Sequence, residues 1–354
     1  MPLNILMIGP YSGSTGGATV LFRQLVSELR GRADAAVDVI DTSHSSCELL
    51  RLPSVTARLV WRVWHSDVIS LHVSSMQAAL YAVVIWIVCA IAGRPWMLRI
   101  FGDASVKHRN MPASRRAIFD WILRRCPLFM VETRRAEQYF RQRCGAVRWH
   151  PNSRPLSVRS SQHDVVAGAR RFVFVGHVKP SKGVREILEA GPLLEGGATV
   201  DVFGELRDGI RAEEFGDTVR YCGELAPEEV SPTLANYDVL LLPTYYGGEG
   251  YPGVILEAFA AGLPVIATRW QAIPEIVGGE NGILVEPRDA KQLASAMRFL
   301  GSDSVEFQKR RAGALQSARW FDSALWTERF LQSIDGLVHS RQAPIGSFQS
   351  LFKG

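Results

Sequence analysis

The sequence is poor in cysteine and lacks the cysteine patterns of cross-linked or zinc-binding proteins. The chain has 354 residues and only five cysteines, with no Cys-x-x-Cys pair among them: Cys47, Cys89, Cys126, Cys144 and Cys222. An odd number at irregular spacing argues against a disulfide framework and against a structural zinc site. We therefore expect a protein that folds around hydrophobic cores in a reducing compartment, the cytoplasm being the simplest.

Long uncharged runs are also scarce. One of them, 68–93, has no formal charge and includes the apolar stretch AALYAVVIWIVCAIAG. The helix expected inside it, 77–92, is shorter than the roughly 20 residues that span a bilayer. A helix packed against a sheet is therefore favoured, with a membrane-inserted helix as the alternative. The early stretch NILMI lacks a preceding basic region, which favours a buried first strand over a signal peptide.

Metal-binding patterns and nucleic-acid-binding motifs are likewise missing. No Asp-x-Asp pair, His-x-x-x-His pair or cluster of His and Cys occurs at ligand spacing, so no metal is implied. The net charge is only +5, and no recognition motif accompanies the basic residues, which disfavours nucleic acid as a partner. The balance of 47% hydrophobic and 21% charged residues is that of a folded globular chain.

Arginine, in contrast, is locally abundant. Two helix-like segments, ASRRAIFDWILRRC and RRAEQYFRQRC, carry Arg115, Arg116, Arg124, Arg125, Arg134, Arg135, Arg141 and Arg143. One interpretation is a basic face exposed to solvent. The other is peripheral attraction to an anionic membrane, where each basic residue near the surface contributes on the order of 1 kcal/mol.

Short apolar strands alternate with helical patterns along both halves of the chain, which is typical of βαβ units and parallel sheets. In the first half we expect strands at NILMIG, AAVDVID, VISLHV, WMLRIFG and LFMVET. In the second half we expect strands at RFVFVG, ATVDVFG, VRYCG, DVLLLPT, PVIAT and GILVE, and helices at 184–190, 227–236, 252–261 and 290–300. The fold class is therefore α/β, with two doubly wound, Rossmann-like domains.

The stretch RWHPNSRPLSVRSSQHD breaks the alternation and is the predicted linker. We expect an N-terminal domain at 1–160, a C-terminal domain at 165–325, and a helical segment at 326–354 that crosses back to the first domain. Because ligands in such sheets bind outside the carboxyl ends of the strands, we expect the loops of both domains to face a shared cleft.

A loop and helix start in the second domain have the chemistry of a phosphate site. In GGEGYPGVILE, Pro252 suits the first helical position, and Gly253 and Val254 offer backbone N–H groups without an intrahelical partner. A helix N-terminus attracts anions, and a diphosphate fits there. Glu257, one turn deeper, can accept hydrogen bonds from a ribose, and Glu249 from a group at the other end of the diphosphate. Taken singly, each glutamate is better explained as an ordinary surface residue, and only the flanking glycines and proline favour a functional pair.

Two further loops add candidate ligands for the same anion. In GHVKPSKG, Lys182 lies just before a predicted helix, where its ammonium could meet a phosphate leaving group, with Lys179 and His177 nearby. The first strand ends in GPYSGSTGGATV, where Gly16 and Gly17 allow close approach of a ligand to the backbone. This loop matches neither Gly-x-Gly-x-x-Gly nor the P-loop, and a plain tight turn is its alternative interpretation.

Together these motifs resemble glycosyltransferase family 4, whose members are retaining enzymes of the GT-B fold, and the resemblance covers almost the whole chain. Its strongest part is the Glu-x7-Glu motif in EGYPGVILE, followed by AFAAGLPVIATRWQAIPEIVGGENGILVEPRD. The loops GHVKPSKG and STGG and the segment HPNS are also similar to the family's pattern. The resemblance implies a nucleotide-diphosphate sugar donor of the UDP or GDP type, no cofactor and no metal, and a glycan or lipid-linked acceptor.

The resemblance also implies roles for single residues. Glu249 and Lys182 would be catalytic, Glu249 orienting the transferred sugar and Lys182 binding the diphosphate. The implied donor-binding residues are Gly16, Gly17, Gly176, His177, Lys182, Gly250, Tyr251, Gly253, Val254 and Glu257. The favoured mechanism of the family is a same-face displacement in which the departing phosphate accepts the acceptor's proton, so no protein base is assigned.

Two departures from the family's pattern bear on activity. His177 stands where many members have arginine, and Phe101 stands where many have histidine before a glycine. Arg99 and Asp103 are therefore our candidates on the acceptor side. The favoured function is a cytoplasmic glycosyltransferase of surface polysaccharide or lipopolysaccharide biosynthesis, peripheral at the membrane. The alternatives are a sugar-nucleotide epimerase of the same fold and a non-catalytic protein that binds a nucleotide sugar.

Overall fold

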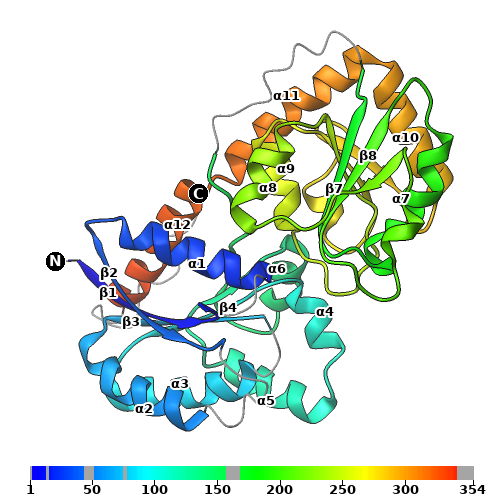
Figure 1. Ribbon diagram of the computed structural model, residues 1–354. Coiled ribbons are helices and arrows are strands. Elements are labelled where there is room, and N and C mark those ends of the chain that lie inside the picture. Colours follow the sequence, from blue (N-terminus) through cyan, green and yellow to red (C-terminus); the bar gives the residue numbers. More distant parts are fainter. Residues whose placement is uncertain (1, 13–15, 44–51, 75–77, 157–167, 341–354) are drawn as a thin grey trace. The chain divides into compact units, whose positions relative to one another are not determined.

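The computed structural model describes residues 2–12, 16–43, 52–74, 78–156 and 168–340, and the chain forms two compact units (Figure 1). Unit 1 comprises Met1–Pro151 and Ala324–Gly354, and unit 2 comprises Asn152–Ser323. The C-terminal helix therefore belongs to the same unit as the first strand. Within the described residues, Cys89, Cys126 and Cys144 are buried and Cys222 is exposed, while Cys47 lies outside these residues.

Unit 1 is built on a parallel sheet of six strands in the order β2-β1-β3-β4-β5-β6. The strands are β1 (Leu3–Gly9), β2 (Ala35–Asp41), β3 (Val68–Val73), β4 (Trp96–Ile100), β5 (Phe129–Val131) and β6 (Val147–Trp149). Every residue of β3 and β4 is buried, which explains why these strands read as continuous apolar runs.

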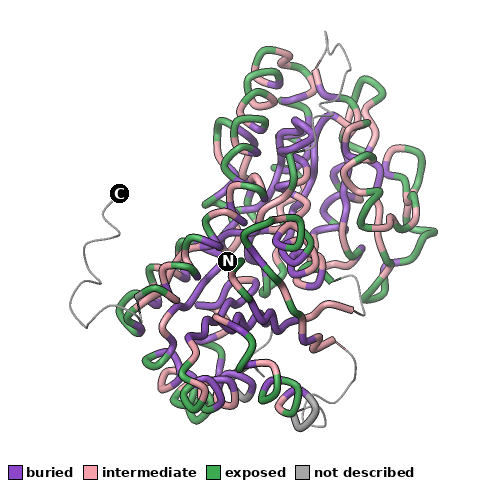
Figure 2. Tube along the Cα trace, turned by 90° about the vertical axis from the view of Figure 1, so that its left-hand side faces the viewer, coloured by how far each residue is buried: buried purple, intermediate pink, exposed green. Residues whose placement is uncertain are grey.

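Helices cover both faces of this sheet (Figure 1). On one face, α1 (Gly17–Arg30) and α12 (Ser323–Ser340) share a core that includes Phe22 and Phe330. On the other face, α2 (Leu52–Arg62), the short η2 (Val63–His65), α3 (Ala78–Ala92) and α5 (Ala113–Leu123) share a second core. Two shorter helices, α4 (Ala104–Arg109) and α6 (Arg134–Arg141), follow β4 and β5. Figure 2 shows the buried strands running between these layers.

The apolar helix α3 is part of this second core. Ala82, Ile85 and Cys89 are buried against the sheet, whereas Ile87 and Ile91 are 44% and 74% exposed. Of the helices in the described part of the chain, none is long and apolar enough to cross a membrane. The packing of α3 is therefore the one favoured from its length.

Unit 2 repeats the doubly wound design with strand order β12-β11-β10-β7-β8-β9, all parallel. Its strands are β7 (Arg171–Val175), β8 (Thr199–Phe203), β9 (Val219–Tyr221), β10 (Val239–Leu242), β11 (Val265–Thr268) and β12 (Gly282–Val285). Helices α8 (Pro227–Leu234), α9 (Gly253–Ala260) and α11 (Ser304–Trp320) lie on one face, and α7 (Val184–Ala190) and α10 (Ala290–Ser302) on the other (Figure 1).

Candidate functional site

Two neighbouring strands of unit 2 carry the loops predicted to bind a ligand. β7 and β10 pair in parallel, so their carboxyl ends lie side by side at one edge of the sheet. The loop after β7 leads through the short 3-10 helix η3 (Pro180–Lys182), and the loop after β10 leads into α9. Gly183 has φ +80, and a Cβ on it would meet the carbonyl oxygen of Pro243 at 2.2 Å. Glycine is required here because the two loops touch.

This close approach brings Lys182 to Glu249. The Lys182 Nζ lies 2.6 Å from Glu249 Oε2, and the hydroxyl of Thr244 donates to the same oxygen at 2.8 Å. Glu249 is only 7% exposed. The two residues predicted as catalytic therefore form a shielded ion pair joined by a charge-assisted hydrogen bond.

The second glutamate of the motif also has a cationic partner. Glu257, on α9, accepts a hydrogen bond from Arg154 Nε at 2.6 Å, and both side chains are largely buried. Arg154 was not predicted as a site residue, because it lies about a hundred positions earlier in the linker sequence. Its neighbour Asn152 is fixed too, donating from Nδ2 to the carbonyl of Tyr251 at 2.8 Å.

The N-terminus of α9 has free backbone donors. The helix begins at Gly253, and Pro252, at the N-cap, contributes no side-chain cap hydrogen bond. The first N–H groups of a helix have no intrahelical acceptor. The helix begins one residue later than we expected, so that Pro252 is the N-cap and not the first helical residue. The amides of Gly253 and Val254 still have the orientation that attracts an anion.

The loop after β7 places its basic residues at the surface of the same edge. His177 is largely exposed, and its Nδ1 lies 3.9 Å from Glu205 Oε2. Partial burial lowers the pKa of His177, and the charge of Arg207 acts in the same direction, so the imidazole is neutral at pH 7. Gly176 has φ +154. The Lys179 ammonium lies 4.3 Å from the ring centroid of Tyr246.

Gly250 and Tyr251, also predicted as donor-binding residues, are buried. The Tyr251 hydroxyl donates to Glu275 Oε2 at 2.5 Å, and its ring packs edge-on against Phe321. Tyr251 thus braces the loop from below. Its side chain is already engaged, and its backbone carbonyl accepts from Asn152 Nδ2.

The predicted residues of unit 1 differ from one another in exposure. Gly16 and Gly17 are exposed at the start of α1, and a Cβ on either would meet nothing within 4 Å. Packing within the described part of unit 1 therefore does not require glycine there. Arg99 and Asp103, predicted on the acceptor side, are 3% and 1% exposed.

Arg99 and Asp103 both hold backbone groups of unit 1 in place. Arg99 donates to the carbonyl of Pro151 at 3.2 Å, and burial lowers its pKa to about 10. Asp103 caps α4 by accepting hydrogen bonds from the backbone N–H groups of Ser105 and Val106. Its other oxygen lies 3.1 Å from Arg135 Nε. In this structure both side chains are engaged within the protein.

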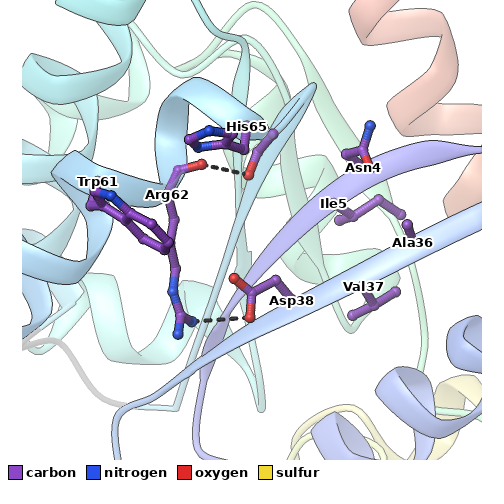
Figure 3. Close-up of a pocket in the computed structure, with 9 residues that line it drawn as sticks. Asn4, Ile5, Ala36, Val37, Asp38, Trp61, Arg62 and His65 are labelled. Carbon is purple, nitrogen blue, oxygen red and sulfur yellow. Dashed lines mark hydrogen bonds and ion pairs between the residues drawn. The ribbon is translucent and has the colours of Figure 1, made fainter.

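A hollow of about 320 Å³ lies elsewhere in unit 1, near the amino ends of β1 and β2 (Figure 3). The Arg62 guanidinium pairs with Asp38 at 3.0 Å, and Figure 3 shows Trp61 alongside the Arg62 side chain. The carboxyl ends of the strands, where ligands bind in such sheets, are at the opposite end. This hollow therefore does not belong to the predicted site.

Comparison with known proteins identifies the relatives of unit 2. Residues 169–303 match the family described as Glycosyl transferases group 1. The glycogen synthase of Mycobacterium tuberculosis is 30% identical over 181 residues, which are 48% of this chain and 41% of that protein. The D-inositol 3-phosphate glycosyltransferase of Corynebacterium diphtheriae is 32% identical over 184 residues, 47% of this chain and 42% of that protein. The chain therefore spans about two fifths of the length of these relatives.

Solved structures resemble the chain over nearly its whole length. Sucrose-phosphate synthase from Thermosynechococcus elongatus has a TM-score of 0.75 at 20% identity and covers 96% of this chain and 100% of its own. HepE from Anabaena, solved in complex with UDP, has a TM-score of 0.75 at 18% identity and covers 94% and 100%. At such identities the likeness shows the fold, and the predicted fold class is confirmed. The family match and the names of the relatives likewise bear out the resemblance and support a glycosyltransferase enzyme.

Proposed function

We propose, for a chain of the glycosyltransferase family 4 type with the GT-B fold, a retaining transfer of a sugar from a nucleotide-diphosphate sugar to a glycan or lipid-linked acceptor. The observation that carries the proposal is the pair of carboxylate–cation contacts at the N-terminus of α9, Glu249 with Lys182 and Glu257 with Arg154. In the proposal, the two carboxylates accept from hydroxyl groups of the donor, and the backbone amides that lie between them in the sequence donate to its diphosphate. The transfer would serve surface polysaccharide or glycoconjugate biosynthesis.

Each group has a distinct task in this proposal. The amides of Gly253 and Val254 bind the diphosphate, Glu257 accepts from the ribose hydroxyls, and Glu249 accepts from a hydroxyl of the sugar that is transferred. Lys182 exchanges its contact with Glu249 for one with the phosphate oxygens. Because HepE from Anabaena was solved with UDP, UDP sugars are the first donors to test, and GDP sugars the second.

The chemistry needs stabilisation of the leaving diphosphate more than it needs a protein base. As the bond between the anomeric carbon and the phosphate oxygen breaks, negative charge grows on that oxygen. Lys182 and the dipole of α9 stabilise this charge at fixed positions, and stabilisation of this kind typically contributes a few kcal/mol. The departing phosphate then accepts the proton of the acceptor hydroxyl on the same face of the sugar, which retains the anomeric configuration.

A panel of donors tests the proposal directly. A thermal-shift screen with UDP and GDP sugars should reveal a stabilising ligand, since a ligand at a hundred times its Kd stabilises the fold by about 2.7 kcal/mol. Transfer to an acceptor panel with that donor, followed by NMR of the anomeric proton, should show retention. An inverted product would contradict the mechanism, and no stabilisation by any donor would contradict the proposed function.

The same assays separate the two alternatives. An epimerase of this fold would convert the donor without any acceptor, so product appearing from donor alone would favour that enzyme. A non-catalytic binding protein would be stabilised by a donor but would neither transfer nor hydrolyse it. The exposed, neutral His177 motivates the second alternative, because an imidazole neutralises a diphosphate less well than a guanidinium does.

We also propose that unit 1 contacts anionic membrane through the layer of α2, η2, α3 and α5, at the cytoplasmic face. This layer exposes Val60, Trp61, Trp64, Ile87, Ile91 and Ile118. Its basic residues include the exposed Arg58 and Arg115, and the exposed Arg124 follows α5 directly, while its four elements contain a single acidic residue, Asp120. Large apolar side chains among arginines are typical of a surface that lies in the headgroup region.

Sedimentation with vesicles tests this contact. The protein should bind vesicles that contain phosphatidylglycerol and not vesicles of pure phosphatidylcholine, and salt should weaken the binding. Replacing both Trp61 and Trp64 with serine should reduce binding, whereas Trp320→Ser should not, although Trp320 of unit 2 is equally exposed at 61%. Equal loss in both variants would argue against a specific face.

A further inference from the structure

Arg154 is a buried cation of unit 2 to which neither the motif nor the predicted roles assign a task. Its side chain is only 10% exposed. Its Nε donates to Glu257 Oε1 at 2.6 Å, and its Nη1 donates to the carbonyl of Ser153 at 3.1 Å. The donors on its Nη2 take part in neither of these two contacts.

These donors reach the first residue of α9. A Cβ added to Gly253 would meet Arg154 Nη2 at 2.1 Å and Cζ at 3.0 Å. Gly253 does not adopt a left-handed conformation, so its backbone alone does not require glycine. The guanidinium therefore occupies the space that glycine leaves open, directly at the place where a diphosphate would approach the helix.

The backbone of Arg154 is fixed, so that only its side chain can move. Its N–H donates to the carbonyl of Phe321 at 2.9 Å, and its carbonyl accepts from the N–H of Ser323 at 3.0 Å. These bonds form a short parallel bridge with Asp322, close to the end of unit 2. Because the backbone of Arg154 is fixed, placing its guanidinium in one position costs little conformational entropy.

The electrostatics of this position favour an anion between the Arg154 guanidinium and the N-terminus of α9. A cation at a helix N-terminus meets the positive end of the helix dipole, which is unfavourable. The ion pair with Glu257 offsets that repulsion in the free protein. A bound diphosphate would be attracted by the guanidinium and by the helix amides together, and arginine binds phosphate through two parallel donors.

We propose that Arg154 is a donor-binding residue: it holds Glu257 in the free protein and donates from its terminal nitrogens to the diphosphate in the complex. Arg154 is thus a second cation for the diphosphate, in addition to Lys182 from the loop after β7, and it lies on the side of the ribose. The inference rests on the proposed function, because the diphosphate belongs to the nucleotide sugar.

Calorimetric titration with UDP and GDP on the full chain tests the assignment. Arg154→Met should raise the Kd of the better-bound nucleotide about 10- to 100-fold, the loss typical of a hydrogen bond to a charged group. Arg154→Lys should raise it about 3- to 10-fold, since it keeps the charge and loses the planar fork. Arg298→Met, which removes an exposed arginine of α10, should change the Kd less than about twofold.

A second background separates direct contact from an action through Glu257. In Glu257→Gln protein, a further Arg154→Met substitution should still weaken UDP binding about 10-fold, because the phosphate contact is lost independently. No additional loss there would overturn the direct contact and leave Arg154 only a positioning residue. Ligand-free melting curves verify folding, and the lysine variant decides if the methionine variant does not fold.

The remaining outcomes separate this inference from the proposed function. Wild-type binding that Arg154→Met and Arg154→Lys leave unchanged would overturn the role of Arg154 alone. A wild-type protein that binds neither UDP nor GDP would overturn the proposed function, and this inference with it.

Discussion

Both units place charged residues where strands of a parallel sheet end, but they use these residues differently. In unit 2, Lys182 and Glu249 pair with each other across two loops that meet at the edge of the sheet. In unit 1, Arg99 and Glu132, at the ends of β4 and β5, are 3% and 2% exposed and hold backbone groups. The same topological position thus carries an ion pair between two loops in one unit and charges that hold backbone groups in the other.

The difference lies in what the charges touch. Glu132 accepts from the backbone N–H of Gly102 at 2.6 Å, and Asp103 caps α4, so removing either leaves a backbone donor or a buried cation without a partner. Lys182 and Glu249 satisfy chiefly each other. We therefore expect substitutions in unit 2 to impair activity at little cost in stability, and substitutions in unit 1 to do the reverse.

The largest expected effect belongs to Glu249. Glu249→Gln keeps the shape of the side chain but removes the charge that orders Lys182 and accepts from the sugar, so kcat should fall about 100- to 1000-fold. The melting temperature should change by only a few degrees. Steady-state kinetics with the best donor measure kcat, and calorimetry measures the melting temperature. Glu286→Gln, in an exposed pair with Arg269, is the control; equal turnover by wild type and Glu249→Gln would remove Glu249 from the site.

Glu132 should show the opposite pattern. Glu132→Gln leaves the buried Arg99 without its nearby negative charge, which should cost about 3 kcal/mol of unfolding free energy. Nucleotide binding should be unchanged, because Lys182, Gly253 and Val254, which we propose to bind the diphosphate, belong to unit 2. Urea denaturation and titration with UDP measure the two quantities. Asp335→Asn, on the surface of α12, is the control, and a stable Glu132→Gln protein would contradict the bracing role.

The sequence alone predicted most strands of both sheets, because β3, β10 and their neighbours are apolar on both faces and therefore read as continuous runs. The strand β6 was missed, since its three residues, VRW, are all half-buried and include an arginine. The helices α2 and α11 were also missed. In α11 the buried residues are Phe307, Ala314 and Ala318, and alanines give little apolar periodicity.

The site could be predicted only as far as local spacing reaches. Glu249, Gly253 and Glu257 lie within one loop and helix, so their relation follows from chain geometry. The contact of Lys182 with Glu249 and that of Arg154 with Glu257 join residues 67 and 103 positions apart. Such pairs depend on the packing of two loops and a linker, which a single sequence does not reveal. Burial is equally invisible, so Arg99 and Asp103 could not be distinguished from ligand-binding charges.

Acid should destabilise unit 1 through two buried histidines. His72 and His150 are fully buried, and burial lowers the pKa of each well below the usual 6.5. Below pH 6.5 the unfolded chain binds protons that the folded chain does not, so stability falls as the pH falls. From pH 7.5 to 5.5 the two groups should cost about 2.5 kcal/mol together.

Urea denaturation at half-unit pH intervals measures this loss. Between pH 7.5 and 8 the two histidines are almost entirely neutral in both states, so that interval provides the internal control. A denaturation midpoint that is constant between pH 7.5 and 5.5 would show that the imidazoles become protonated within the fold.

The smallest expected effect is that of Asp103→Asn. This variant distinguishes a purely structural role of Asp103 from a contact with the acceptor. Asparagine caps a helix as well as aspartate does, so the bonds to Ser105 and Val106 remain and only the pairing with the half-exposed Arg135 is lost. The unfolding free energy should therefore fall by no more than about 1 kcal/mol. If Asp103 also binds the acceptor, as we predicted from the departure at Phe101, the KM for the acceptor should rise while the Kd of UDP stays constant. If KM is unchanged and only stability falls, Asp103 belongs with Glu132 among the braces of unit 1.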